Sequence, residues 1–147
     1  MGGTFDNFHS GHALLISTAC NLAKDAFIGV ISDQFGKTLF EGKLFNDKIQ
    51  KLDVRIKSVN DFLLENKFIA TVGILDNPYG PSITDKKADL IVVSYETRRT
   101  ADSINVIRIN NGLNILDIVT IPWEYDGNGE VISSSRIRTK RYSNHGE

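Results

Sequence analysis

The sequence predicts an α/β fold in which helices cover both faces of a parallel sheet. Short apolar runs, typical of strands buried on both faces, alternate with segments whose apolar residues recur at helical spacing. The polar and glycine-rich motifs follow the expected strands, where parallel sheets bind ligands. A chain of 147 residues with 41% hydrophobic content can bury one core, so we expect residues 1–147 to form a single domain.

The first half of the chain contains one expected strand between two expected helices. Residues 12–24 have apolar side chains at helical spacing, and residues 26–32 (AFIGVIS) form a nearly continuous apolar run. Residues 34–47 mix polar residues with glycine breakers and are expected to form a loop with a possible short helix. Helical spacing returns over residues 53–66, with Asp53 as the expected N-cap.

The second half repeats the alternation. Residues 70–75 and 90–94 are expected strands, separated by the loop 76–81, which contains two prolines and a glycine. Residues 101–111 favour a helix that Gly112 closes in the left-handed conformation. The remaining expected elements are a strand over 117–121, a helix over 134–141 and a flexible tail over 142–147.

A phosphate site is expected at the start of the chain, over residues 2–12 (GGTFDNFHSGH). The two glycines tolerate positive φ and let the backbone approach a ligand, and Asp6 is expected to order the turn. His12 falls at the start of the expected helix, where free N–H groups and the helix dipole favour an anion. The imidazoles of His9 and His12 are easily charged near neutral pH. An isolated pair of this kind also occurs as an ordinary helix cap, so a second motif is needed.

That second motif is ISSSRIR, over residues 132–138. Serine hydroxyls and free N–H groups at a helix start suit the phosphates of a triphosphate. The GTFD turn, HSGH and ISSSRIR, in this order, resemble the signatures of the HxGH nucleotidyltransferase superfamily. Within it, the segments DNPYGP, VSYETR and INVIRINNGL resemble phosphopantetheine adenylyltransferases of the archaeal and eukaryotic type.

The resemblance implies a Rossmann-like, doubly wound fold and a reaction in coenzyme A biosynthesis. ATP and 4′-phosphopantetheine would give dephospho-coenzyme A and pyrophosphate by direct in-line attack, with Mg²⁺ as the partner of the triphosphate. Thr4 and Lys48 would hold the attacking phosphate, and His12 would stabilise charge in the transition state. Lys37 and Lys43 lie in the same poorly matching segment as Lys48. The ATP-binding residues implied are Gly3, Thr4, Phe5, His9, His12, Glu96, Arg98, Arg99, Asn105, Ser133, Ser134, Ser135 and Arg136.

The start of the chain departs from the family pattern. In the family, a hydrophobic strand of several residues precedes the GTFD turn, whereas here only Met1 precedes the two glycines. A missing central strand would leave neighbouring backbone groups unpaired. We therefore expect either a very short first strand or a natural start upstream of Met1.

Two alternatives stay open. Another nucleotidyltransferase, such as a cytidylyltransferase or an adenylyltransferase acting on nicotinamide or flavin mononucleotide, would use the same turn and HxGH motif. The cytidylyltransferases typically carry an RTEGIST-like run, and this sequence has none. A nucleotide-binding module without turnover is the alternative from a different class.

The composition argues against several other classes. A formal net charge of −1 gives no general attraction to nucleic acid or to an anionic membrane. No apolar run approaches the roughly 20 residues of a membrane span, so a cytoplasmic protein is expected. Cys20 is the single cysteine and lies in an apolar helical segment, where a packing role is expected. The oligomeric state is left open.

Overall fold

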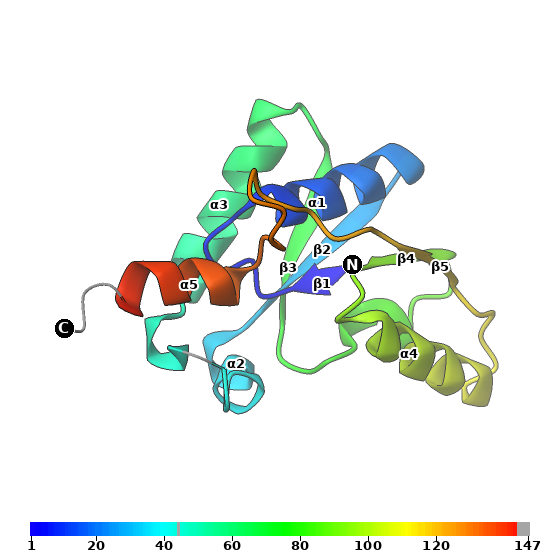
Figure 1. Cartoon of the computed structure of the whole chain (residues 1–147). Coiled ribbons are helices and arrows are strands. Elements are labelled where there is room, and N and C mark those ends of the chain that lie inside the picture. Colours follow the sequence, from blue (N-terminus) through cyan, green and yellow to red (C-terminus); the bar gives the residue numbers. More distant parts are fainter. Residues whose placement is uncertain (44, 144–147) are drawn as a thin grey trace.

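Helices and strands alternate along the chain as the sequence predicts (Figure 1). The computed structural model of the protein describes residues 1–43 and 45–143. Its elements are β1 (Gly2–Gly3), α1 (Ser10–Leu22), β2 (Ala26–Ile31), α2 (Asp33–Leu39), the 3₁₀ helix η1 (Asn46–Lys48), α3 (Leu52–Glu65), β3 (Ala70–Leu75), the 3₁₀ helix η2 (Gly80–Ile83), β4 (Leu90–Val93), α4 (Arg98–Asn110), β5 (Asp117–Thr120) and α5 (Ser134–Ser143).

The strands pair in parallel, in two hydrogen-bonded ladders, β1-β2-β3 and β4-β5. β1 pairs with β2 through Gly2 and Gly3, and a natural start upstream of Met1 stays a prediction. Within residues 1–43 and 45–143 no ladder joins β1 to β4. The chain moves from β1 to β2 and β3, and only then to β4 and β5. The boundary between the two ladders is therefore the topological switch point, where such folds bind ligands.

Helices cover both faces of the strands, which confirms the doubly wound α/β fold (Figure 1). On one face, α1 and α3 enclose a core that includes Phe5, Ile16 and Val30 together with Val92 of β4. On the other face, α4 packs on β4 and β5 around a second core. Neighbouring side chains of a strand point to opposite faces, so Val92 enters the first core while the residues beside it enter the second. The buried residues of the second core are Ile91, Val93, Ala101, Ile104 and Leu116.

Several local expectations are corrected. The N-cap of α3 is Lys51, and Asp53 lies inside the helix, where its carboxylate accepts a hydrogen bond from the N–H of Val54 at 2.9 Å. The segment 34–47 is more helical than expected, because Ser32 caps α2 by accepting from the N–H of Phe35 at 3.0 Å. Gly112 follows α4 with φ +74°, as expected.

The expected tail over 142–147 starts inside a helix. Tyr142 and Ser143 are the last residues of α5, and residues 144–147 lie outside the described residues. The Tyr142 ring packs against Phe45, with 6.0 Å between ring centroids. The end of α5 is therefore anchored on the segment that precedes η1.

Glycines in β1, β2 and η2 make room for Leu75. A Cβ at Gly2, Gly29 or Gly80 would lie 2.4 to 2.7 Å from carbon atoms of the Leu75 side chain. Such distances are too short for packed carbon atoms. Leu75 is buried, ends β3 and so fixes the start of the following loop on the sheet.

Candidate active site

The turn after β1 holds its shape through two residues with left-handed backbone. Phe5 has φ 57° and Asn7 has φ 47°, a conformation that costs energy for residues other than glycine. Neither Gly2 nor Gly3 has a positive φ, which corrects the expected use of these glycines. The Phe5 ring is fully buried in the larger core, so packing maintains the strained turn.

Asp6 orders this turn from inside the protein. Its carboxylate is fully buried and accepts hydrogen bonds from the backbone N–H of Gln50 at 2.9 Å and from the side-chain amide of Asn7 at 3.2 Å. The same carboxylate forms an ion pair with the guanidinium of Arg138 in α5. Asp6 therefore connects three segments that are distant in the sequence.

The helix start formed by ISSSRIR lies against the GTFD turn. Ser134 donates its hydroxyl proton to the backbone oxygen of Asp6, and Arg138 reaches the Asp6 carboxylate. Ser133 accepts from the N–H of Arg136 at 3.2 Å, so its hydroxyl caps the helix. The serine hydroxyls thus bond protein groups, and the donors best placed for a phosphate are the N–H groups of the first turn of α5. The structure brings the two expected phosphate motifs together.

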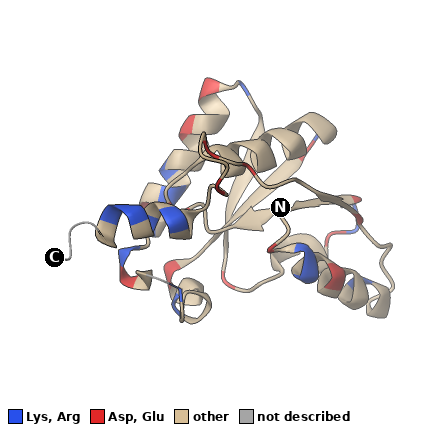
Figure 2. Cartoon of the chain, viewed as in Figure 1, with Lys and Arg blue, Asp and Glu red and all other residues tan. Residues whose placement is uncertain are grey.

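α5 carries only basic charged side chains (Figure 2). Arg138 is buried on Asp6, whereas Arg136 is half exposed and forms an ion pair with Glu130. A cleft of about 200 Å³ lies beside Ser133 and Arg136. Arg136 is therefore the arginine of this motif that can turn toward a phosphate in solvent.

The two histidines form a stacked pair at the start of α1. The His9 Nδ1 accepts from the N–H of Gly11 at 3.1 Å, and the His12 Nδ1 accepts from the N–H of His9 at 3.2 Å. The ring centroids are 3.8 Å apart, with 24° between the planes. A neutral imidazole that accepts at Nδ1 carries its proton on Nε2, so each ring can donate from Nε2.

Both histidines favour the neutral form. Burial, with a smaller contribution from the neighbouring His9, lowers the pKa of His12 to about 3. Burial also lowers the pKa of His9, although the Asp6 carboxylate opposes this effect. The expectation that these imidazoles are easily charged near pH 7 is therefore wrong for the protein alone.

Lys48 ends η1, and its segment is tied to the turn after β1. Gln50 donates its backbone N–H to Asp6, and its side-chain oxygen accepts from the N–H of Asn7 at 3.0 Å. The Lys48 ammonium lies 5.6 Å from the centre of the Tyr142 ring, where a cation is attracted to the aromatic face. Lys43 instead lies over Phe40. Of the three candidate lysines, Lys37, Lys43 and Lys48, the one nearest in sequence to this attachment is Lys48.

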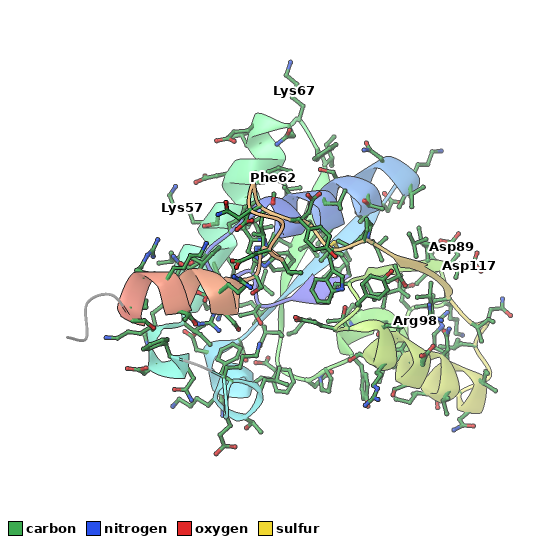
Figure 3. All side chains as sticks on the ribbon, in the orientation of Figure 1. Lys57, Phe62, Lys67, Asp89, Arg98 and Asp117 are labelled. Atoms are coloured by element: carbon green, nitrogen blue, oxygen red, sulfur yellow. The ribbon has the colours of Figure 1, made fainter. Side chains whose placement is uncertain are left out.

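The loop after β4 lies at the carboxyl ends of the strands, as does the turn after β1. Arg98, the first residue of α4, lies 3.4 Å from the hydroxyl of Thr120 at the end of β5 and pairs with Asp102 at 3.5 Å. Asp89 and Asp117 lie at the opposite, amino ends of the strands, where β4 and β5 begin (Figure 3). Glu96 and Arg99 are the exposed neighbours of Arg98.

Asn105 does not lie with these residues. Its side-chain amide donates to the backbone oxygen of Leu116 at 3.0 Å and accepts from the N–H of Leu116 at 2.8 Å. Leu116 directly precedes β5, so Asn105 lies toward the edge of the sheet opposite Arg98. Asn105 therefore lies apart from the other expected ATP-binding residues, and its amide fastens α4 to the start of β5.

Three features near the carboxyl ends of the strands were not predicted from the sequence. Arg55 of α3 is fully buried and pairs with Asp33 at 2.9 Å. Burial opposes ionisation of Asp33, but hydrogen bonds from the backbone of Leu52 and from Arg55 outweigh it and keep the pKa of this carboxyl below its usual value. An arginine among the apolar positions of an expected helix was the signal.

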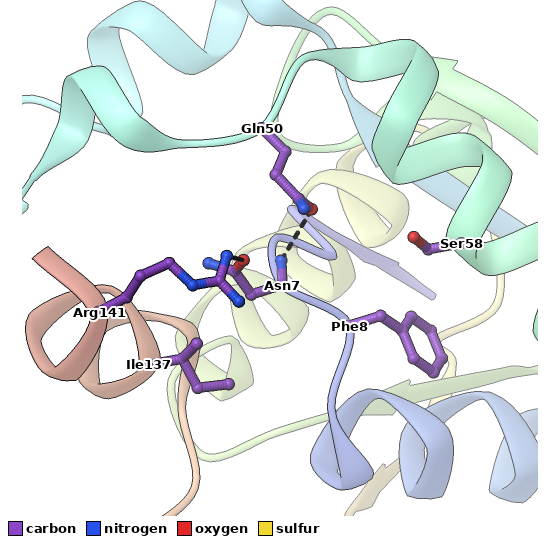
Figure 4. A pocket seen from close by; sticks show the side chains of 6 residues that line it. All are labelled: Asn7, Phe8, Gln50, Ser58, Ile137 and Arg141. Atoms are coloured by element: carbon purple, nitrogen blue, oxygen red, sulfur yellow. Dashed lines mark hydrogen bonds between the residues drawn. The ribbon is translucent and has the colours of Figure 1, made fainter.

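The other two features are an aromatic pair and a cleft. Tyr95 and Trp123 follow β4 and β5, with ring centroids 5.8 Å apart. Aromatic residues directly after two expected strands could have been found by inspection. A cleft of about 370 Å³ opens between the turn, α3 and α5, with Asn7 bonded on one side to Gln50 and on the other to Arg141 (Figure 4).

The remaining observations concern metals, membranes and the single cysteine. Across residues 1–43 and 45–143, no group of three or more histidine, cysteine, aspartate or glutamate side chains is placed to hold a metal ion. None of the helices in this part of the chain is long and apolar enough to cross a membrane. Cys20 packs against the larger core, and burial raises the pKa of its thiol.

Comparison with known proteins identifies the family. Residues 1–140 match the family model described as cytidylyltransferase-like. Among curated proteins, the phosphopantetheine adenylyltransferase of Methanothermobacter thermautotrophicus is 41% identical over 94% of this chain and 80% of its own length. The enzymes of that name from Methanopyrus kandleri and Pyrobaculum aerophilum are 40% and 35% identical, again over 94% of this chain, and are themselves covered to 86% and 87%.

A solved structure agrees with the fold. The crystal structure of a protein of unknown function from Archaeoglobus fulgidus has a TM-score of 0.70 to this chain at 30% identity, covering 84% of this chain and 96% of that one. The family match, the archaeal relatives and the joined GTFD and ISSSRIR motifs agree with the resemblance. The chain belongs to the phosphopantetheine adenylyltransferase family of cytidylyltransferase-like nucleotidyltransferases.

Proposed function

We propose that this chain transfers the adenylyl group of ATP to 4′-phosphopantetheine, giving dephospho-coenzyme A and pyrophosphate. The observation that carries the proposal is the contact between the start of α5 and the turn after β1, through Ser134, Arg138 and Asp6. This contact supports the proposal because α1 and α5 both begin beside the topological switch point, and helix N-termini favour phosphate.

The reaction is a direct displacement. An oxygen of the acceptor phosphate forms a bond to the α-phosphorus of ATP, and the bond from that phosphorus to the oxygen bridging the β-phosphate breaks. Pyrophosphate leaves with the electron pair. The protein accelerates such a step by holding two anions together and by neutralising the spreading charge. A covalent intermediate is not required.

His12 contributes a neutral hydrogen-bond donor. Its Nδ1 accepts from the backbone of His9, so its Nε2–H can donate to an oxygen of the α-phosphate. The Phe5 and Phe8 rings lie 5.3 Å and 5.4 Å from the His12 ring, measured between centroids, and limit its movement. Orientation of a fixed donor toward developing charge is the role that we assign to His12.

The cationic groups are supplied by other residues. Thr4 and Lys48 orient the acceptor phosphate, and Arg98 and Arg136 bind the triphosphate after Arg136 leaves Glu130. The further contacts that we propose for ATP are Gly3, Phe5, His9, Glu96, Arg99, Ser133, Ser134 and Ser135. Mg²⁺ bound to the triphosphate would neutralise charge on the leaving pyrophosphate, and it would need few protein ligands because the phosphates supply most of them.

Pyrophosphate release with a panel of acceptors tests the proposal. The protein is assayed with ATP and Mg²⁺ plus 4′-phosphopantetheine, nicotinamide mononucleotide or flavin mononucleotide, and with CTP plus glycerol phosphate. Release only with 4′-phosphopantetheine is the expected result. Release with another acceptor would replace the proposed substrate, and silence with all acceptors while ATP still binds would favour a binding module without turnover.

A further inference from the structure

We infer that Arg55 is a positioning residue for the acceptor side of this site, on the basis of the proposed function. Arg55 is fully buried, so it acts through the backbone rather than on a substrate. Its guanidinium holds the segments that carry Thr4 and Lys48 in one arrangement.

The guanidinium donates to four different segments. Its Nε donates to the backbone oxygen of Gln50 at 2.9 Å, and its Nη1 donates to the backbone oxygens of Thr4 at 2.8 Å and Ile31 at 2.7 Å. Its Nη2 donates to the carboxylate of Asp33 at 2.9 Å. These groups belong to the end of β1, the end of β2, the start of α2 and the loop before α3.

Arginine is required for this arrangement. A guanidinium has five N–H groups in a rigid plane and keeps its charge when buried, whereas an ammonium has three donors around one nitrogen. A lysine here could reach only some of the four acceptors. The backbone oxygens that it missed would stay buried without a partner or would shift toward water.

The residues proposed to bind 4′-phosphopantetheine depend on these bonds more than the ISSSRIR helix does. Thr4 is bonded directly, and Gln50 lies two residues after Lys48. The ISSSRIR helix is fastened separately, by Ser134 and Arg138 to Asp6. Loss of the Arg55 hydrogen bonds should therefore displace Thr4 and the Lys48 segment, while α5 stays attached to Asp6.

Arg108 of α4 supplies a matched control. It is also fully buried, and its guanidinium donates to backbone oxygens only, those of Asn114 at 2.7 Å, Ser82 at 2.7 Å, Asp85 at 2.9 Å and Ala88 at 3.3 Å. These oxygens lie in the segments before β4 and β5, toward the edge of the sheet opposite Thr4. Replacement of Arg108 removes a comparable set of bonds without touching the acceptor side.

The experiment compares wild type, Arg55→Lys and Arg108→Lys. We expect both variants to lose stability, but only Arg55→Lys to raise the KM for 4′-phosphopantetheine, by roughly tenfold, because lost hydrogen bonds to a charged group displace Thr4. The Kd for ATP should rise by a smaller factor, because Gly3 and Phe5 flank Thr4 whereas α5 keeps its attachment. Hydrogen exchange should accelerate over residues 2–8 and 46–51 in Arg55→Lys, and over residues 80–90 in Arg108→Lys.

Equal acceptor KM values in the two variants, or faster exchange over the same segments in both, would overturn the inference. If Arg55→Lys does not fold, Asp33→Asn provides the comparison, since this half-exposed carboxylate is the one partner of Arg55 that can be changed by mutation. Silence of the wild type with 4′-phosphopantetheine would reject the proposed function instead, and hydrogen exchange would still decide the role of Arg55.

Discussion

At the scale of single residues, the site depends on groups whose charge differs from what the sequence suggests. His12 is neutral because it is buried, and the hydrogen bond at its Nδ1 fixes the tautomer. Arg138, the second arginine of the ISSSRIR motif, pairs with the buried carboxylate of Asp6. The exposed cations that remain for a triphosphate are fewer than the motifs suggest.

We expect His12→Ala to lower kcat by about 10² to 10³, the usual loss when one donor to developing charge is removed. ATP binding should change little, since the other contacts remain. Calorimetric Kd values for ATP, measured beside pyrophosphate release, check this expectation. His12→Gln keeps an N–H donor and should retain more activity than His12→Lys; the reverse order would contradict the role of a neutral donor.

Stability should fall in mild acid because His12 is buried in its neutral form. Its pKa is about 3 in the folded protein and 6.5 in the unfolded chain. Between these values the unfolded chain binds the extra proton, so lowering the pH favours unfolding by up to about 1.4 kcal/mol per pH unit. Above pH 6.5 His12 is neutral in both states, and the protein has the full stability that this effect removes at lower pH. Urea midpoints at pH 7, 6 and 5 should show this slope.

The matched variant for this measurement is His12→Asn, which has no titrating ring. Its unfolding free energy should depend less on pH over the same range, and other titrating groups cancel in the difference from wild type. Parallel slopes for the two proteins would show that burial of His12 does not control acid stability.

At the scale of elements, α5 is held mainly by polar contacts. None of its residues belongs to the buried apolar clusters that the described chain forms, and its attachments run through Ser134, Arg138 and Arg141 to the turn after β1. The hairpin-like segment before it adds ion pairs from Glu130 and Asp126. The helix that completes the nucleotide side is therefore the part of the fold most sensitive to loss of a charge.

Arg138→Met should destabilise the protein by about 3 to 5 kcal/mol, because it leaves the buried Asp6 carboxylate without its cation. Urea unfolding followed by circular dichroism measures the loss. Lys57→Ala removes an exposed i,i+4 pair with Asp61 and should change nothing measurable. Equal effects of the two substitutions would contradict the assignment of Arg138 as the ion-pair partner of the buried Asp6 carboxylate.

Much of this element scale could be predicted from the sequence. The strand over residues 70–75 is confirmed at both ends, because a short apolar run between polar breakers has few alternatives. α2 was underestimated because Gly36 looks like a breaker, whereas in the structure a Cβ there would lie 2.4 Å from the Phe40 ring. Local pattern could not reveal that contact. Asn105 was misplaced for the same reason, since its partner at Leu116 is set by how α4 packs.

At the scale of the whole molecule, the two ladders share a core although no ladder joins them in the described chain. Val92 and Ile121, from β4 and the end of β5, pack in the cluster that contains Phe5 and Val30. The boundary between the ladders is therefore sealed by side chains. Its position beside both phosphate motifs could be predicted, but the break in hydrogen bonding between the two ladders could not.

We expect the protein to unfold in one transition, because this shared core couples the two ladders. Trp123 is the single tryptophan and lies just after β5, so its fluorescence reports on the β4-β5 side, while circular dichroism reports on all helices. The two urea midpoints should coincide. Midpoints that differ would show that the ladders unfold separately.

The ion pair between Asp6 and Arg138 joins residues 132 positions apart. During synthesis, Asp6 leaves the ribosome long before Arg138 is translated. A nascent chain can therefore form β1, α1 and β2 but not the ion pair between Asp6 and Arg138. The proposed nucleotide site, which needs both motifs, can therefore form only after α5 has been translated and has cleared the exit tunnel. Nascent chains that still lack α5 would then lack half of the proposed ATP site.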